Sequence, residues 1–305
     1  MAKILVVGSI NMDLVVRVPH APEPGETVLG GDFATYPGGK GANQAVAASR
    51  MGGEVSMVGR VGNDDFGDSL IQTLLNDQVK TTYVIKDADA ATGVAMIAVT
   101  ADGENMIMVA SGANMELSIE DVNNARPLMR EADILLVQLE SPLEVVTRAV
   151  ELAKAYDLPV VFNPAPGQIL SRALLSNVDY LTPNLSELKC LTDEENVDGA
   201  IQKLKEWGVK TLVITLGVNG VRVVTEEMDR HMPAFEVTAV DTTAAGDAFN
   251  GAFAVALAEE KPLLEAVWMG LAAGALAVTK CGAQTSLPTR EAVEQFLHSH
   301  GLTIT

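Results

Sequence analysis

The chain has 305 residues, of which 48% are hydrophobic and 20% charged, a composition typical of a folded protein long enough to bury a large core. Its formal net charge is −19, with 21 Lys and Arg against 40 Asp and Glu. This balance argues against a broad basic face for nucleic acid or an anionic membrane, so any phosphate group has to be bound locally.

Cysteine usage and the absence of targeting signals restrict the class of protein further. Cys190 and Cys281 lie outside any CxxC or Cys/His cluster, which disfavours a disulfide framework and a structural zinc site and fits a reducing cytoplasm. The sequence shows neither a signal peptide nor an apolar span of about 18 residues. We therefore expect a cytoplasmic protein with no nucleic-acid and no membrane partner.

Short apolar runs alternate with helical patterns along the chain. Buried parallel strands are predicted at 4–7, 133–139, 159–162, 180–182 and 211–215. Between them, Ser141-Pro142-Leu143-Glu144 reads as a capping box that starts a helix reaching about residue 156, and a second helix is predicted at 198–207, ended by Gly208. The alternation predicts the α/β class, with a doubly wound, mostly parallel, Rossmann-like sheet in a single domain over 1–305.

Two regions interrupt this alternation. Segments 27–36, 93–100 and 105–110, the last two joined by a turn at 101–104, predict antiparallel strands. We expect a small antiparallel β-sheet lid, formed by insertions near 11–36 and 92–111, over the edge of the main sheet where ligands usually bind. Its apolar residues fall on more than one face, which predicts a homodimer formed through the lid.

The segment after the first strand, Gly8 to Asp13, lacks the Gly-x-Gly-x-x-Gly turn of a dinucleotide-binding fold, which counts against a dehydrogenase. Asn11 and Asp13 instead place two polar side chains at alternating positions, suited to holding a polyol. An Asx-turn that simply ends the strand is at least as good an interpretation.

The stretch "YPGGKGANQAVAASRMGG" combines glycines around Lys40 with a helix predicted at 42–51. It does not have the spacing of a phosphate-binding Walker A loop. The glycines let the backbone approach a small ligand, and Asn43 is expected at the same sheet edge as Asn11 and Asp13. The competing interpretation is a plain glycine-rich turn.

Three further polar positions follow predicted strands. Glu140 serves either as a helix N-terminal charge or as a hydroxyl acceptor. Asn184 and Glu187 are three residues apart on one helix face, which suits hydrated Mg²⁺ and phosphates and equally suits a surface helix turn. The stretch "TLGVNGV" at 215–221 suits a nucleotide loop and equally a hairpin turn.

The stretch "DTTAAGDAFNGA", residues 241–252, places Asp247 at the start of a predicted helix after a run of small residues. Unpaired N–H groups at a helix N-terminus attract anions, and an Asp there is either a cap or a base. Capping alone does not require the small residues Ala244, Ala245 and Gly246. The stretch therefore predicts an acid beside an anion site.

Together these stretches resemble the ribokinase-like (PfkB-type) carbohydrate kinases over nearly the whole chain, "GGKGANQA" and "DTTAAGDAFNGA" matching the two signatures of that family. The resemblance implies the ribokinase fold, a catalytic base at Asp247 and an anion hole at Ala244, Ala245 and Gly246. It also implies a sugar site of Asn11, Met12, Asp13, Gly39, Lys40, Gly41, Ala42, Asn43 and Glu140.

For ATP the resemblance implies contacts from Asn184, Glu187, Thr215, Leu216, Gly217, Val218, Asn219, Gly220, Gly246 and Asp247, with Glu187 holding Mg²⁺ through water. A monovalent cation, K⁺, is expected at Asp241, Thr243, Ala277, Lys280, Gly282 and Ser286. Leu271 departs from the Asn or His that relatives often carry near adenine.

The activity implied by the resemblance is ATP-dependent phosphorylation of D-ribose at its 5-hydroxyl. Two alternatives stay open. One is a kinase for another sugar such as fructose, deoxyribose or 2-keto-3-deoxygluconate. The other is a sugar-binding regulator without turnover, which would have no need of a base at Asp247.

Overall fold

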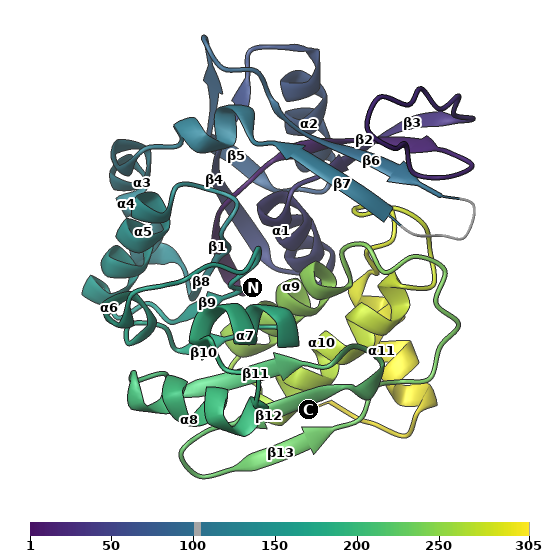
Figure 1. The fold of residues 1–305 in the computed structure, drawn as a ribbon. Helices are drawn as coiled ribbons and strands as arrows, with labels where there is room; N and C mark the ends of the chain where they lie inside the picture. Colours follow the sequence, from purple (N-terminus) through teal and green to yellow (C-terminus); the bar gives the residue numbers. More distant parts are fainter. Residues whose placement is uncertain (101–104, 305) are drawn as a thin grey trace.

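The computed structural model describes residues 1–100 and 105–304, so the predicted turn at 101–104 lies outside the described residues. A nine-stranded sheet has the order β13-β12-β11-β10-β9-β8-β1-β4-β5, and a separate four-stranded sheet has the order β3-β2-β6-β7 (Figure 1). The large sheet is parallel except for its β11–β12–β13 edge. The α/β fold class with a mostly parallel main sheet is therefore confirmed.

The strands of the main sheet are β1 (Lys3–Val7), β4 (Glu54–Gly62), β5 (Lys80–Asp87), β8 (Ile134–Val137), β9 (Val160–Phe162), β10 (Tyr180–Leu181), β11 (Thr211–Thr215), β12 (Val221–Val224) and β13 (Asp229–Met232). The chain goes from β1 to β4 and β5 on one side and then to β8, β9, β10 and β11 on the other. This reversal opens a crevice beyond the carboxyl ends of β1 and β8, where ligands bind in folds of this kind.

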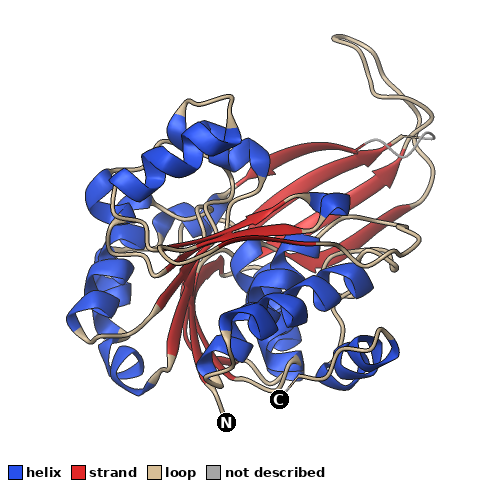
Figure 2. Cartoon of the chain, turned by 90° about the horizontal axis from the view of Figure 1, so that it is seen from below, coloured by secondary structure: helices blue, strands red, loops and turns tan. Residues whose placement is uncertain are grey.

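Helices cover both faces of the main sheet (Figure 2). One face packs on α1 (Lys40–Arg50), α2 (Asp65–Asn76), α9 (Ala245–Ala258), α10 (Leu263–Ala277) and α11 (Arg290–Ser299). The other packs on α3 (Ile119–Asn124), α4 (Arg126–Glu131), α5 (Leu143–Ala155), α6 (Arg172–Leu175), α7 (Leu185–Thr192) and α8 (Val197–Glu206). Side chains of β1 alternate between the two cores, which explains its uninterrupted apolar run. No helix of the described chain is long and apolar enough to cross a membrane.

The capping box predicted at the start of α5 is wrong. Pro142 has an extended conformation, with ψ near 130°, and is the N-cap instead of the first helical residue. Ser141 therefore lies one position too early to cap the helix, and its buried hydroxyl has no hydrogen-bond partner among the described residues. The prediction for 198–207 is confirmed by α8, which ends before Gly208 at φ 92°.

The smaller sheet, called the lid here, consists of β3 (Phe33–Gly38), β2 (Asn11–Arg17), β6 (Gly93–Val99) and β7 (Asn105–Ala110). The predicted strand at 27–36 begins only at Phe33, and its partner is β2, a strand that we did not predict. The outer pairs are antiparallel as expected, whereas β2 and β6 run parallel. Asn11 and Asp13 thus begin a lid strand, and the Asx-turn interpretation is wrong.

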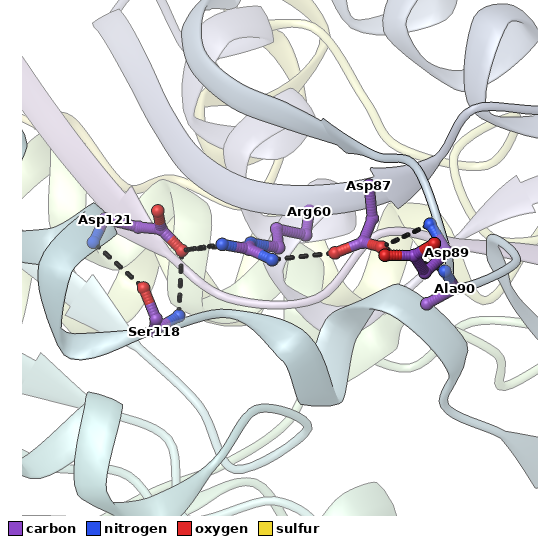
Figure 3. A network of polar contacts seen from close by, with 6 residues as sticks. All are labelled: Arg60, Asp87, Asp89, Ala90, Ser118 and Asp121. Atoms are coloured by element: carbon purple, nitrogen blue, oxygen red, sulfur yellow. Dashed lines mark hydrogen bonds and ion pairs between the residues drawn. The ribbon is translucent and has the colours of Figure 1, made fainter.

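An ion-pair network on β4 holds the segment that leads into β6 and the segment that follows β7 (Figure 3). Arg60 pairs with Asp87 at 2.7 Å and with Asp121 at 2.9 Å. Asp87 also accepts the backbone N–H of Ala90, just before β6, and Asp121 forms a capping box with Ser118, soon after β7. Because these side chains are largely shielded from water, their interactions are screened less than those of surface pairs. The network therefore fastens both ends of the β6–β7 part of the lid to the same end of β4.

Candidate active site

The polar residues that follow β1 and β8 meet the start of α1 in the crevice. Ser9 Oγ donates to Glu140 Oε2 at 2.6 Å, and the backbone N–H of Lys40 donates to the same oxygen at 3.1 Å. Glu140 thus accepts at the N-terminus of α1, a favourable place for a carboxylate. Of the two roles considered for Glu140, the structure supports a helix N-terminal charge, although for α1 and not for α5.

The lid contributes Asn11 and Asp13, which point to the same side of β2 and are both buried. Asn114 donates to the Asn11 side-chain oxygen at 2.6 Å, which fixes the amide of Asn11. A side chain at Gly38 would lie 2.4 Å from the Asp13 carboxylate, so only glycine fits beside it. Burial and then the nearby carboxylates of Glu140 and Asp247 raise the pKa of Asp13 to about 7.

Asp247 lies in the first turn of α9, with its side chain 6% exposed. Asn43 Nδ2 donates to one carboxylate oxygen and Gln44 Nε2 to the other, both at 2.9 Å. Burial raises the pKa of Asp247, whereas Lys40 and the two amide donors oppose that rise. The carboxylate faces a cavity of about 200 Å³ that is also lined by Lys40, Asn184, Glu187, Thr215 and Gly246.

The residues before Asp247 form the turn that creates an anion site. Ala244 is the N-cap of α9 in the left-handed region, with φ 58°. Within the described chain, the N–H groups of Gly246 and Asp247 have no acceptor, and the space around the Gly246 Cα is open. The N–H of Ala245 differs from our expectation, because it donates to Thr242 O at 3.3 Å. Two free amides therefore remain for an anion.

Lys40 is the cation of the site. Desolvation would lower its pKa, but Asp247, Glu140, Glu187 and Asp13 surround it and raise the pKa above its ordinary value. Lys40 therefore stays charged and offsets part of the repulsion among these carboxylates.

Asn184 and Glu187 form a reciprocal capping box at the start of α7, and both side chains line the cavity. From the sequence, this pair suited either a helix turn or a site for Mg²⁺ and phosphates, and the structure is compatible with both. Burial raises the pKa of Glu187. The cavity is lined by two carboxylates, Glu187 and Asp247, and this fits Mg²⁺, which proteins usually hold through one or two carboxylates, water and substrate phosphates.

The stretch 215–221 is a hairpin turn between β11 and β12, closed by a bond from Leu216 N to Gly220 O at 2.8 Å. Thr215 lines the cavity, whereas Val218 is 92% exposed. Gly220 has φ 90°, and a side chain there would lie 2.0 Å from a carbonyl oxygen of β13. The geometry of the turn is therefore enough to explain the glycine at position 220, and no nucleotide contact is needed to explain it.

Some residues expected at the sugar site are explained by packing. Met12 and Ala42 lie in the hydrophobic core. Leu271, which is expected near the adenine and not at the sugar site, lies in the same core. A side chain at Gly41 would collide with the backbone of Gly8 and Ser9. Gly39, at φ 88°, lets the chain turn from β3 into α1.

The residues expected to bind K⁺ lie on two segments that are hydrogen-bonded to each other. Asp241 accepts the N–H of Thr243 at 2.9 Å and that of Gly282 at 2.8 Å. Burial would raise the pKa of Asp241, but the bonds from Thr243 and Gly282 hold it below its usual value. A direct salt bridge from Lys280 to Asp241 would make a K⁺ ion unnecessary, but Lys280 is exposed and forms no ion pair with Asp241 in the described chain. Ala277 and Ser286 are buried in the second segment.

Sequence reasoning missed the buried amides behind Asp247. Gln44 belongs to the "GGKGANQA" motif, and Asn163 follows the apolar run of β9 just as Asn11 and Glu140 follow other runs. That position after a buried strand was the signal that could have identified Asn163. Gln44 carried no such signal, because its role depends on a contact with Asp247 203 positions away.

Comparison with known proteins agrees with this geometry. The pfkB family carbohydrate kinase model matches residues 1–290. The chain belongs to the pfkB family of carbohydrate kinases. It is 44% identical to a ribokinase of Haemophilus influenzae, over 96% of this chain and 97% of that one.

Solved structures of the family show the same fold. A ribokinase from Thermotoga maritima has a TM-score of 0.90 and 44% identity, covering 98% of this chain and 100% of the other. A ribokinase from Arabidopsis thaliana, complexed with ribose and ATP, has a TM-score of 0.89 and 33% identity, covering 97% of this chain and 99% of the other. The resemblance inferred from the two motifs is therefore confirmed.

Proposed function

We propose that this kinase transfers the γ-phosphoryl group of ATP to the 5-hydroxyl of D-ribose, giving D-ribose 5-phosphate and ADP. The observation that carries the proposal is the buried Asp247 carboxylate beside two free N–H groups at the start of α9. The ribokinases to which the chain is similar support the choice of sugar.

The reaction uses Asp247 as general base. The carboxylate takes the proton of the 5-hydroxyl while the oxygen attacks the γ-phosphorus, and the bond to the bridging oxygen of ADP breaks. The N–H groups of Gly246 and Asp247 stabilise the charge on the transferred group, and Lys40 adds a positive charge within the same site. Mg²⁺, held through Glu187 and water, would neutralise charge on the phosphates of ATP.

The sugar is oriented by the lid and by α1. Asp13 accepts hydrogen bonds from sugar hydroxyls, and Asn43, whose buried side-chain oxygen has no partner among the described residues, accepts another. Because a buried unpaired oxygen is costly, a hydroxyl at this place gains affinity from pairing with it. The chain works as one domain, 1–305, whose lid closes over the sugar.

Two further features belong to the proposal. A K⁺ ion between Asp241 and carbonyl groups of segment 277–286 would fix the turn that leads to the anion site. A homodimer would cover the apolar side chains of β7, where Met106, Ile107, Met108 and Val109 are 48% to 63% exposed.

The test is release of ADP from Mg·ATP with a panel of sugars. Ribose should be turned over with the highest kcat/KM. Preference for fructose, deoxyribose or 2-keto-3-deoxygluconate would replace the substrate and keep the kinase. Binding of a sugar with no ADP release would instead make the protein a regulator.

A further inference from the structure

Gln44 lies on the first turns of α1, fully buried behind the Asp247 carboxylate. Its side-chain nitrogen donates to Asp247 Oδ1 at 2.9 Å and to Asn163 Oδ1 at 3.1 Å, and its oxygen accepts from Gln138 Nε2 at 2.6 Å. Both N–H groups and the oxygen of this amide are therefore used. A buried side chain so fully bonded has a single orientation.

The direction of these hydrogen bonds follows from one fixed acceptor. The carbonyl of Thr182 can only accept, so it receives Asn163 Nδ2, at 3.1 Å. The oxygen of Asn163 then faces Gln44, and the nitrogen of Gln44 has to face both Asn163 and Asp247. At the other end, the side-chain oxygen of Gln138 is left buried without a partner in the described chain. A buried oxygen without a partner is costly. Rotating the Gln138 amide would not remove the cost, because the Gln138 oxygen would then face the Gln44 oxygen.

We propose that Gln44 is a positioning residue that orients the Asp247 carboxylate for proton abstraction. This inference rests on the proposed function for its catalytic meaning. Asn43 also donates to the Asp247 carboxylate, but its amide is held at that single point, because its own oxygen has no partner in the described part of the chain. Gln44 is held from three sides and donates to Oδ1 of Asp247, whereas Oδ2 accepts, among the described residues, only from the less constrained Asn43.

The charges around Asp247 explain why such a donor matters. Lys40 on α1 favours the ionised carboxylate, whereas Glu140 in the segment after β8, Glu187 on α7 and Asp13 on the lid repel it. Asp247 has to be ionised to act as a base, and a donated hydrogen bond favours that form. Loss of the Gln44 donor should therefore raise the pH at which the carboxyl gains its proton.

The test is Gln44→Met, which has a similar length and no hydrogen-bonding group. The acid limb of kcat/KM against pH should move up by about one unit. At neutral pH, kcat should fall roughly 10-fold while the KM for ribose and for ATP changes less than about 2-fold. The ¹³C carboxyl signal of Asp247, identified by its loss in Asp247→Asn, should titrate at higher pH by the same amount without any turnover.

The control is Gln138→Met, which removes an equally buried amide that touches Gln44 but not Asp247. A merely structural role predicts similar effects of both variants, whereas the proposal predicts that Gln138→Met leaves the acid limb in place. If Gln44→Met does not fold, Gln44→Asn, which keeps an amide but cannot reach Asp247, should give the same shift.

The two hypotheses fail in different ways. An Asp247 carboxyl that titrates at the same pH with and without the Gln44 amide would overturn the positioning role, whatever the substrate. A wild-type enzyme that releases no ADP with any sugar, but whose carboxyl titration shifts in Gln44→Met, would overturn the proposed reaction and support the orientation of Asp247 by Gln44.

Discussion

Asp13 should destabilise the sugar-free protein, and replacing it with the isosteric Asn should therefore stabilise the fold. Its pKa rises from 3.8 to about 7, first because the carboxyl is buried and then because Glu140 and Asp247 lie near it. A carboxyl with a raised pKa binds more protons in the folded state than in the unfolded state between these two values. The free energy of unfolding consequently falls as the pH rises through this window.

The size of the effect follows from the shift. Each unit corresponds to about 1.4 kcal/mol, so the full penalty above pH 7 is roughly 4 kcal/mol. About half of this penalty is already present at about pH 5.5, and the other half accumulates above that pH. Asp13→Asn should thus gain roughly 4 kcal/mol over wild type at about pH 8.5 and roughly 2 kcal/mol at about pH 5.5.

Urea unfolding without sugar at these two pH values measures the difference, with the exposed Asp32→Asn as control. Calorimetry should show the opposite effect on ribose affinity, a loss of about 1–3 kcal/mol for the missing acceptor. The reasoning is refuted if Asp13→Asn is no more stable than wild type at the higher pH, or if its advantage is the same at both.

Three further outcomes are expected. Asp247→Asn should lower kcat by about 10²–10⁴-fold and leave sugar and ATP binding nearly intact, because the amide keeps the shape but accepts no proton; a kcat within about 3-fold of wild type would contradict the role of the base. Initial rates with Mg·ATP should rise several-fold when K⁺ replaces tetramethylammonium at equal ionic strength, and Asp241→Ala should abolish the rise; equal rates in wild type would remove the cation site. Ile107→Glu on β7 should convert a dimer into a monomer in sedimentation, because a charge replaces an apolar side chain that is 58% exposed in the single chain, whereas wild type sedimenting as one species of 32.1 kDa would contradict the dimer.

Local patterns in the sequence were enough to predict five of the nine strands of the main sheet, β1 and β8 to β11, and the start of α9, whereas β4, β5, β12 and β13 were not predicted as strands of this sheet. Uninterrupted apolar runs such as 134–137 are specific because a strand buried on both faces tolerates no polar residue. The stretch "DTTAAGDAFNGA" identified Asp247 and its helix because a helix cap by itself does not require a run of small residues before the acid.

The tertiary structure decided which of these residues meet. Pro142 took the cap position predicted for Ser141, and Asn11 and Asp13 proved to begin a lid strand, since each outcome depends on neighbours that the local sequence does not specify. Gln44, Gln138 and Asn163 lie far apart in the chain, and a buried amide is costly unless it finds a partner. Which partner it finds is set by the packing of α1 against the main sheet and α9, and the surroundings of the Asp247 carboxylate therefore emerge only when the whole chain is folded.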